Sequence, residues 1–395
     1  MKKSKIECAD LFAMIPKDLL FNLEKETNIN HHVKKLSGLL MLKLLLFSLL
    51  NSERVSLRVM EEIFNSGQFK AFSGKGNQKT KHSTIGDRVA NINCDFFEQV
   101  FHALCEKFEP LARGKKISKK FRDICIHDSS FVGLSAKLLR TGMVCGKGTI
   151  KQIKFTVGLK NSFPANVLVL KNKAEVSEEV ALKKSILEAN YSRNSIILFD
   201  RGLQRRKTFC EFSDKNILFV TRLKNKARYV ETKKFKEVKG RKTKTLLLQK
   251  DVLVKLVGER EILTKNEFRL IVAMSLETRE TFLFLTNIFN LNAKEITDAY
   301  KRRWEIEVFF KFLKQELNFK HFVSRNENGI KVMMYATFIL ALLLLAYKEK
   351  NSISSYKIAK IRFTHELEME ITKEIVLACG GSIFKFNKFK NSQYG

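Results

Sequence analysis

Hydrophobic residues in the first 118 positions recur every three to four residues, which is the spacing of amphipathic helices. Few segments in this part of the chain alternate between apolar and polar residues as strands do. The predicted helices run from Pro16 to Lys25, Val33 to Leu50, Leu57 to Asn65 and Ser83 to Lys107. We therefore predict an all-helical N-terminal domain over residues 1–118.

Two stretches are apolar almost without interruption, Leu36 to Leu50 and Val332 to Tyr347. The second has 16 residues, which is short of the roughly 20 that a helix needs to cross a bilayer. We expect both to be buried core helices of a protein without a membrane partner. The first ten residues, MKKSKIECAD, lack the sustained apolar stretch of a signal peptide, so a cytoplasmic location is expected.

Beyond residue 119 the pattern changes to short apolar runs, several of them β-branched, mixed with helical segments. In chain order we predict three strands, a helix, a strand, a helix and a strand: Ile124 to Ile126, Ile153 to Leu159, Ala165 to Leu170, Glu178 to Ala189, Ile196 to Phe199, Leu203 to Phe212 and Ile217 to Arg222. This is the element order of a ribonuclease-H-like α/β core, with its first part over residues 119–224. Asp128 follows the first of these strands and Asp200 follows the fourth. Because the first and fourth strands are neighbours in that fold, the two Asp residues should lie side by side.

The order is interrupted at about residue 225 by alternating runs separated by Lys- and Gly-containing turns. These runs are Arg228 to Val238, Thr243 to Leu256, Phe268 to Ser275 and Thr281 to Thr286. We predict a β-rich insertion over residues 225–295, a second part of the core over residues 296–350, and a helical, basic C-terminal tail over residues 351–395.

A line of charged residues crosses an otherwise apolar helical segment after the insertion. Tyr300, Arg303, Glu307 and Lys314 stand at offsets 0, 3, 7 and 14, and on one helix they fall within roughly 60° of each other. Buried charges are costly unless they bind a partner, a metal or a ligand. A self-contained ion network on an amphipathic helix is the alternative interpretation. Trp304, the only tryptophan, is expected to pack under this line rather than to stack on a bound partner.

The spacing Tyr-x2-Arg-x3-Glu-x6-Lys resembles the signature of transposases of the insertion sequence four family. In that family the Glu is the third carboxylate of a DDE metal site, and two Asp residues precede it at the ends of strands. Asp128 and Asp200 match these positions, and DRGLQ from Asp200 resembles the family's Asp-Arg-Gly-aromatic block, with Leu203 in the aromatic place. The offset of 107 positions from Asp200 to Glu307 matches the family's β-rich insertion. The resemblance covers about residues 120–346.

The resemblance implies a catalytic role for three residues, Asp128, Asp200 and Glu307. Together they would bind two Mg²⁺ ions, for which Mn²⁺ can substitute because the ligands are hard oxygens. Two such ions activate a water or a terminal 3′-hydroxyl and stabilise the leaving oxygen of a phosphodiester. Taken singly, each Asp could equally be a turn or N-cap residue.

The signature also implies contacts with the phosphates of DNA. Arg303 and Lys314 would bind phosphates close to the reacting bond. Tyr300 would contact a phosphate near the transposon end.

Charge and cysteine content support a nucleic-acid partner in a reducing compartment. The formal net charge is +32 with a pI of about 9.8, and double-stranded DNA is a polyanion that balances such a charge. A hydrophobic content of 45% over 395 residues is unusual for a ribosomal protein. The seven cysteines are scattered without a C-x-x-C pair, which argues against a structural zinc. His127, beside Asp128, is expected to be a strand-end residue rather than a ligand.

The segment Lys79 to Ile92 resembles a recognition helix of a helix-turn-helix motif. Ser83 and Thr84 are the expected N-cap, and Thr84, Asp87 and Arg88 are expected to face outward, with Thr84 and Arg88 as DNA contacts. An ordinary capped amphipathic helix is the alternative.

These observations favour a bacterial, nucleoid-associated DNA transposase. It would bind the terminal inverted repeats of its insertion sequence, cleave the DNA at the element ends and transfer the strands into target DNA, as a homodimer or larger assembly. A nuclease of the same fold without strand transfer is one alternative, and a catalytically inactive or domesticated sequence-specific DNA-binding protein is another.

Overall fold

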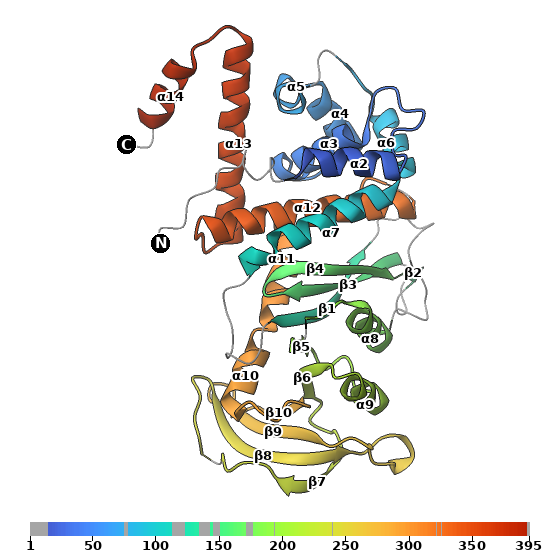
Figure 1. Cartoon of the computed structure of the whole chain (residues 1–395), viewed down its shortest axis with the longest axis vertical. Helices are drawn as coiled ribbons and strands as arrows, with labels where there is room; N and C mark the ends of the chain where they lie inside the picture. The colour runs from blue at the N-terminus through green and yellow to red at the C-terminus, as the bar shows by residue number, and fades with distance from the viewer. Residues whose placement is uncertain are drawn as a thin grey trace. The chain divides into compact units, whose positions relative to one another are not determined.

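The computed structural model describes residues 15–74, 78–112, 123–133, 143–144, 151–170, 177–192, 194–238, 240–320, 322–324 and 326–392 (Figure 1). The chain divides into two compact units. The helical unit contains Met1–Leu111, Val132–Gln152 and Lys311–Gly395, and the sheet unit contains Ala112–Phe131 and Ile153–Phe310. The predicted boundary at residue 118 lies outside the described residues.

The described strands form one sheet in the order β2, β3, β1, β5, β6, β10, β9, β8 and β7, with β4 also paired to β3. Their bounds are β1 Ile124–Gly133, β2 Met143–Val144, β3 Lys151–Lys160, β4 Phe163–Leu170, β5 Ile196–Phe199, β6 Leu218–Leu223, β7 Tyr229–Lys234, β8 Leu246–Leu256, β9 Phe268–Ser275 and β10 Thr281–Thr286. Strands β1, β5 and β6 are parallel. All four residues of β5 are buried, as expected for a parallel strand that is covered on both faces.

Helix α8 (Glu178–Glu188) leads into β5 after strands β2 to β4, and helix α9 (Arg206–Asp214) connects β5 to β6. Ser177 caps α8 by accepting a hydrogen bond from the Val180 amide. Buried residues of α8 and α9 share one apolar cluster with residues of β5, β6 and the following strands. With the strand order β4, β3, β1, β5, β6, this arrangement confirms the predicted ribonuclease-H-like α/β fold.

The β-rich insertion continues the sheet of the core. Strand β10 pairs antiparallel with β6, and the pairs β10–β9, β9–β8 and β8–β7 are also antiparallel. Strands β9 and β10 have the predicted bounds. The insertion and the core therefore share one hydrogen-bonded backbone framework, and Val252, Val254 and Leu270 of the insertion join the apolar cluster of the core.

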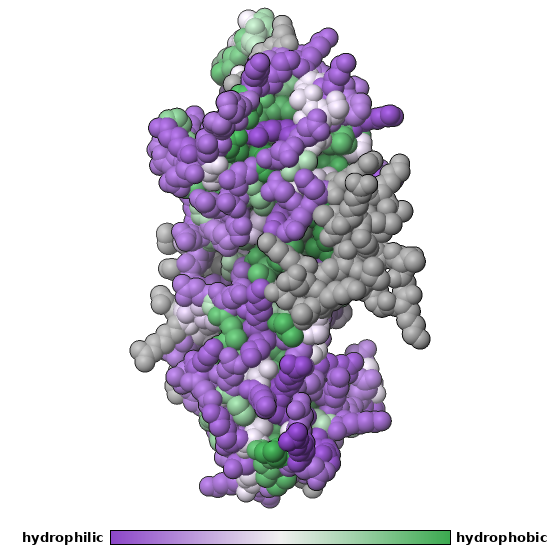
Figure 2. Space-filling view, turned by 90° about the vertical axis from the view of Figure 1, so that its right-hand side faces the viewer, coloured by the Kyte–Doolittle hydropathy of each residue, from purple (hydrophilic) through white to green (hydrophobic). Residues whose placement is uncertain are grey.

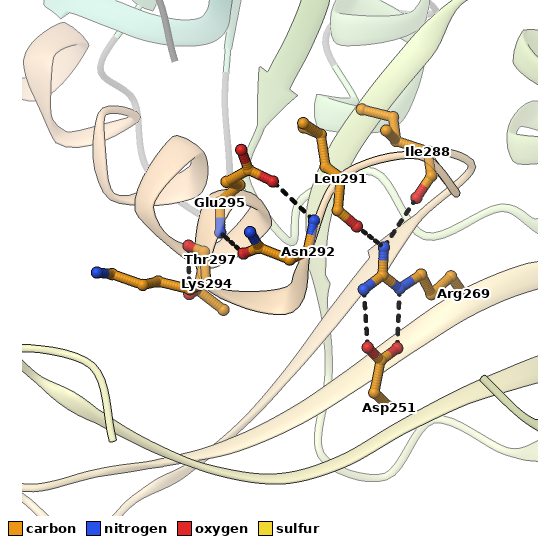
Figure 3. A network of polar contacts seen from close by, with 8 residues as sticks. All are labelled: Asp251, Arg269, Ile288, Leu291, Asn292, Lys294, Glu295 and Thr297. Carbon is orange, nitrogen blue, oxygen red and sulfur yellow. Dashed lines mark hydrogen bonds and ion pairs between the residues drawn. The ribbon is translucent and has the colours of Figure 1, made fainter. Parts of the chain in front are cut away.

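A fully buried ion pair stabilises the end of the insertion (Figure 3). The guanidinium of Arg269 donates to both carboxylate oxygens of Asp251, at 2.8 and 2.7 Å, and neither side chain is exposed. The same guanidinium donates to the backbone carbonyls of Ile288 and Leu291, at 3.3 and 2.6 Å. Asn292, the next residue, opens α10 (Ala293–Lys301) with a capping box. The pair thus fixes where the next helix begins.

The signature segment forms two helices, so the prediction of one helix is wrong. Helix α10 ends at Lys301 and α11 runs over Trp304–Glu316. The amides of Arg302, Arg303 and Glu305 bond to carbonyls three residues earlier, which is the tighter 3₁₀ pattern. This junction changes the rotation of Tyr300 relative to the residues after it. Within α11, Ile306, Phe309, Phe310, Phe312 and Leu313 are buried, as the apolar pattern predicted.

The helical unit is built around one long apolar helix. Its described helices are α2 Lys17–Glu26, α3 Gly38–Asn51, α4 Leu57–Asn65, α5 Gly67–Ser73, α6 His82–Asn91, α7 Cys94–Phe108, α12 Glu327–Lys350, α13 Tyr356–Ala378 and α14 Ile383–Ser392. Helix α12 packs against α3, α6, α7 and α13. It is long and apolar enough to cross a membrane, but 94% of its most apolar window is buried inside the protein, as expected for a core helix.

The helix predicted from Ser83 to Lys107 is two helices, α6 and α7. The break falls at Ile92 and Asn93. The side chain of Asn93 caps α7 by accepting a hydrogen bond from the Asp95 amide. The predicted continuous helix is therefore wrong because an N-cap residue interrupts the apolar pattern.

Replacing Arg269 by Met should lower the free energy of unfolding by about 3–5 kcal/mol, because the Asp251 carboxylate would stay buried without a cation. The measurement is urea unfolding. The matched control is Arg228→Met, since the Arg228–Glu261 pair is 63% and 77% exposed and an exposed pair contributes less than about 1 kcal/mol. Equal losses in the two variants would contradict this account.

Candidate active site

The two aspartates lie next to each other because of the register of two parallel strands. Ile124 to His127 of β1 pair in order with Ile196 to Phe199 of β5, so Asp128 and Asp200 are the next residues of each strand. The Asp128 Oδ1 accepts a hydrogen bond from the Ser129 amide at 2.8 Å, and the Asp200 Oδ1 accepts one from the Gly202 amide at 2.7 Å. The expected adjacency is confirmed. Asp128 does not end its strand, however, because β1 continues to Gly133.

Burial and like charge act together on these carboxyl groups. Burial raises the pKa of Asp128 to about 7, with further contributions from the charges of Asp200 and Glu178. Burial also raises the pKa of Asp200, again assisted by Glu178. Two adjacent carboxylates favour either a proton or a bound cation. The site is therefore built to receive positive charge.

The third predicted carboxylate reaches this site through an arginine. The Arg303 guanidinium donates to the Glu307 carboxylate one helical turn away, and its Nη1 lies 3.9 Å from Oδ2 of Asp128. The side chains of Arg303 and Asp128 are 17% and 16% exposed, and that of Glu307 is 34% exposed. Arg303 therefore links Asp128 to Glu307, and the three predicted catalytic residues belong to one cluster in the sheet unit.

The oxygen atoms of these carboxylates are suitable ligands for a divalent metal ion, but the side chains are not positioned to bind one ion together. In the described part of the chain, no three His, Cys, Asp or Glu side chains are placed to hold a metal ion together. The reason is visible in the ion pair, because Glu307 faces the Arg303 guanidinium. Hard carboxylate oxygens are what Mg²⁺ and Mn²⁺ prefer. For joint metal binding, Glu307 must exchange its arginine partner for the ion.

The other signature residues have differing environments. Tyr300 is 9% exposed, its ring packs edge-on against Phe284 with centroids 5.4 Å apart, and burial raises its pKa to about 12. Lys314 is half-buried, seven residues beyond Glu307 in α11. Trp304 is 61% exposed, so the expectation that it packs beneath the site is wrong.

Three residues near the aspartates were not found from the sequence. Lys154 of β3 is fully buried and its Nζ lies 2.7 Å from Oε2 of Glu178, the first residue of α8. The Ser129 hydroxyl donates to the other oxygen of Glu178. A lysine in an alternating strand is typical of an exposed face, and a glutamate in the first turn of a helix is common because of the helix dipole. The sequence signal for this pair was therefore weak.

His127 lies inside β1 and not at a strand end as predicted, because the strand continues to Gly133, and its side chain has a structural role. It is 1% exposed, its Nδ1 is 2.9 Å from the Ser185 hydroxyl, and its Nε2 is 2.7 Å from the Tyr191 hydroxyl. Burial lowers its pKa to about 3, so the imidazole is neutral. Both ring nitrogens are used inside the fold.

In the helical unit, α6 differs from the predicted recognition helix at two points. Its N-cap is Lys81, without a side-chain cap bond, and the Glu61 carboxylate instead accepts from the His82 amide at 2.8 Å. Thr84 and Asp87 are exposed as predicted. The prediction that Arg88 faces outward is wrong, because its guanidinium donates to the backbone carbonyls of Leu36 and Ile29, at 2.9 and 2.6 Å.

Without divalent metal, Asp128→Asn should raise the free energy of unfolding by about 4 kcal/mol at pH 8, since burial raises the pKa from 3.8 to about 7 and one pKa unit is worth about 1.4 kcal/mol. The folded-state pKa lies above the unfolded value, so the wild type loses stability as pH rises from about 4 to 7. The gain should be smaller at pH 5. Asparagine retains Oδ1 for the Ser129 amide. Thermal unfolding in EDTA is the measurement, with exposed Asp87→Asn as control; a loss of stability at pH 8 would contradict the repulsion.

Comparisons with known proteins agree with this geometry. A family model described as "Transposase DDE domain" matches residues 119–344. A chain from Geobacillus stearothermophilus named as a probable transposase for insertion sequence element IS5377 is 23% identical over 273 residues, covering 68% of each chain. A chain from Synechocystis named as a transposase for insertion sequence element IS4SA is 30% identical over 98 residues, covering 25% of this chain and 27% of its own.

A solved structure also aligns with most of the chain. It is a piggyBac transposase synaptic complex with hairpin DNA, which aligns with a TM-score of 0.47 and 9% identity over 95% of this chain and 82% of its own. The family match covers more than half of the 395 residues and includes both aspartates and Glu307. The chain belongs to the transposase DDE domain family and is a DDE-class transposase that acts in DNA transposition.

Proposed function

We propose that Asp128, Asp200 and Glu307 are the catalytic carboxylates with which this transposase cleaves DNA at the terminal inverted repeats of its insertion sequence and joins the ends to target DNA. The observation that carries this proposal is the register of β1 and β5, which makes Asp128 and Asp200 adjacent. The ion pairs of Arg303 with Glu307 and Asp128 support the inclusion of Glu307.

DDE transposases generally use divalent metal ions. We infer that the ion here is Mg²⁺, with Mn²⁺ as a substitute and two ions per site, because the donors are carboxylate oxygens. When bound, such ions activate a water or a 3′-hydroxyl and stabilise the leaving oxygen. The protein contributes two aspartates on paired strands, whose Oδ1 atoms are fixed by the Ser129 and Gly202 amides. No covalent intermediate with the protein is needed.

Arg303 has a role that changes with the state of the site. In the absence of metal its guanidinium neutralises Glu307 and approaches Asp128. With Glu307 and Asp128 neutralised by metal ions, the Arg303 guanidinium would be available to bind a DNA phosphate as a bidentate donor. Tyr300 packs beside it, with the guanidinium 5.9 Å from the ring centroid. We also propose that Tyr300 contacts a DNA phosphate near the transposon end, as the signature implies.

The charge and surface of the protein support a DNA partner. A net charge of +32 is far more than solubility requires, and hydrophilic side chains cover most of the described surface on the face drawn in Figure 2. We propose that exposed Thr84 of α6 contributes to recognition of the terminal repeats, whereas the internal bonds of Arg88 argue against a direct DNA contact. Synapsis of two ends would require a homodimer or larger assembly.

Glu307→Gln should reduce Mg²⁺-dependent cleavage and strand transfer by at least about 10³-fold, because the amide cannot supply the negative charge that a metal ligand needs. The measurement uses a labelled duplex that carries the sequence flanking the gene, and it follows nicking at the element boundary and joined product. Binding of the same duplex should remain.

The matched control is Glu305→Gln. Glu305 lies two residues earlier, where its carboxylate bonds to Ser162 and Arg302, away from the proposed ligands. Retained chemistry in Glu307→Gln would refute the assignment of the third carboxylate. Binding without chemistry in the wild type would favour a DNA-binding protein that lacks catalysis.

Lys314→Ala should weaken binding of end-containing and unrelated duplexes by the same factor, since a lysine that contacts phosphate carries no sequence information. It should also reduce the slope of log affinity against log salt concentration by about 1. Fluorescence anisotropy at several salt concentrations measures both quantities. An unchanged salt slope would show that Lys314 makes no phosphate contact.

A further inference from the structure

Glu178 lies at the two aspartates, although no part of the DDE signature includes it. The Ser129 residue connects Glu178 to Asp128, because its amide donates to Asp128 and its hydroxyl donates to Oε1 of Glu178. The amide of Gly202 donates to Asp200. Ser129 thus contacts both Asp128 and Glu178.

Gly202 shows how near Glu178 comes to Asp200. A Cβ atom at position 202 would lie 2.3 Å from Cγ of Glu178 and 2.8 Å from Oδ1 of Asp200. Two atoms at those distances from one point are within about 5 Å of each other, and the charges of Glu178 act on both aspartates. Any side chain at 202 would force the side chain of Glu178 or Asp200 to move. The glycine therefore permits a third negative charge at this place.

Lys154 fixes the direction of the Glu178 side chain. Its ammonium group donates to Oε2 of Glu178 at 2.7 Å, and none of the Lys154 side chain is exposed, whereas 34% of the Glu178 side chain is. The Lys154 ammonium also lies 5.0 Å from the centroid of the Phe131 ring. A buried cation with a partly exposed carboxylate holds that carboxylate at the rim of the site rather than in the core.

We propose that Glu178 is a fourth, outer-shell carboxylate of the metal site, whose charge strengthens divalent-ion binding between Asp128 and Asp200 without direct coordination, and that Lys154 and Ser129 hold it there. The inference rests on the proposed role of the two aspartates as metal ligands. If Glu178 served only as the counter-ion of Lys154, it would have no reason to lie close to two other carboxylates, because like charges repel. A bound divalent ion removes that repulsion, so the same arrangement favours the metal-bound state.

The experiment measures Mn²⁺ binding to the full chain without DNA, by calorimetry or by the electron paramagnetic resonance of free Mn²⁺. Glu178→Gln should raise the Mn²⁺ dissociation constant about tenfold, as loss of an outer-shell carboxylate typically does. Glu188→Gln is the matched control, because Glu188 is exposed at the far end of the same helix. It should bind Mn²⁺ like the wild type.

A second variant separates metal binding from stability, since Glu178→Gln leaves Lys154 buried without its carboxylate. In Lys154→Met with Glu178→Gln both charges are absent, so the metal-free thermal midpoint should return towards that of the wild type. The proposal requires this double variant to retain the tenfold loss of Mn²⁺ affinity. Wild-type affinity in the double variant would overturn it and leave Glu178 as the counter-ion of Lys154.

Asp200→Asn distinguishes failure of this inference from failure of the proposed function. Reduced affinity in Asp200→Asn together with normal affinity in the double variant would overturn the role of Glu178 alone. Normal affinity in Asp200→Asn would overturn the proposed metal ligands and, with them, the role of Glu178. Reduced affinity in both would support the fourth carboxylate.

Discussion

The repulsion between Asp128 and Asp200 is the constraint on which the rest of the site depends. Parallel pairing of β1 with β5 leaves the two carboxyl groups adjacent, and burial adds to the cost of charging them. The backbone cannot relieve this cost without changing the register of four paired residues in the centre of the sheet. Relief must therefore come from protons or from cations, and the surrounding residues determine which of these are available.

Two cations of different character lie at the site. Lys154 is fully buried and bound to Glu178 at 2.7 Å, so its position is fixed by the fold. Arg303 stands at the junction of α10 and α11, where bonds of the 3₁₀ type replace regular helical bonds. The start of α10 is itself set by the Arg269–Asp251 pair through the carbonyls of Ile288 and Leu291. The β-rich insertion thus contributes to the position of Glu307, although none of its strands carries a catalytic carboxylate.

Much of the fold could be predicted from the sequence because strands buried on both faces and amphipathic helices have distinct patterns. Strands β9 and β10 and helix α4 have the predicted bounds, and the adjacency of the aspartates followed from strand order. Helix ends were less predictable, since the break at Arg302 and Arg303 and the break at Asn93 depend on local bonding rather than on periodicity. Glu178 and Arg88 could not be assigned from pattern, because their partners, Lys154 and the carbonyls of Ile29 and Leu36, lie at least 24 residues away in sequence.

Lys154 and Arg303 differ in burial, and this difference determines which of them can more easily leave its carboxylate partner. Moving Lys154 would leave an ammonium group without its carboxylate in the interior, at a cost of several kcal/mol, so Lys154 and Glu178 should stay paired when a metal ion binds. Arg303 has 17% of its side chain exposed and faces a carboxylate that is 34% exposed, so solvent and phosphate can replace its partner at lower cost. Of the two cations, Arg303 could therefore give up its carboxylate partner at lower cost. If metal ions neutralised the carboxylates, its guanidinium would be available for a DNA phosphate, and metal loading and DNA binding would favour each other.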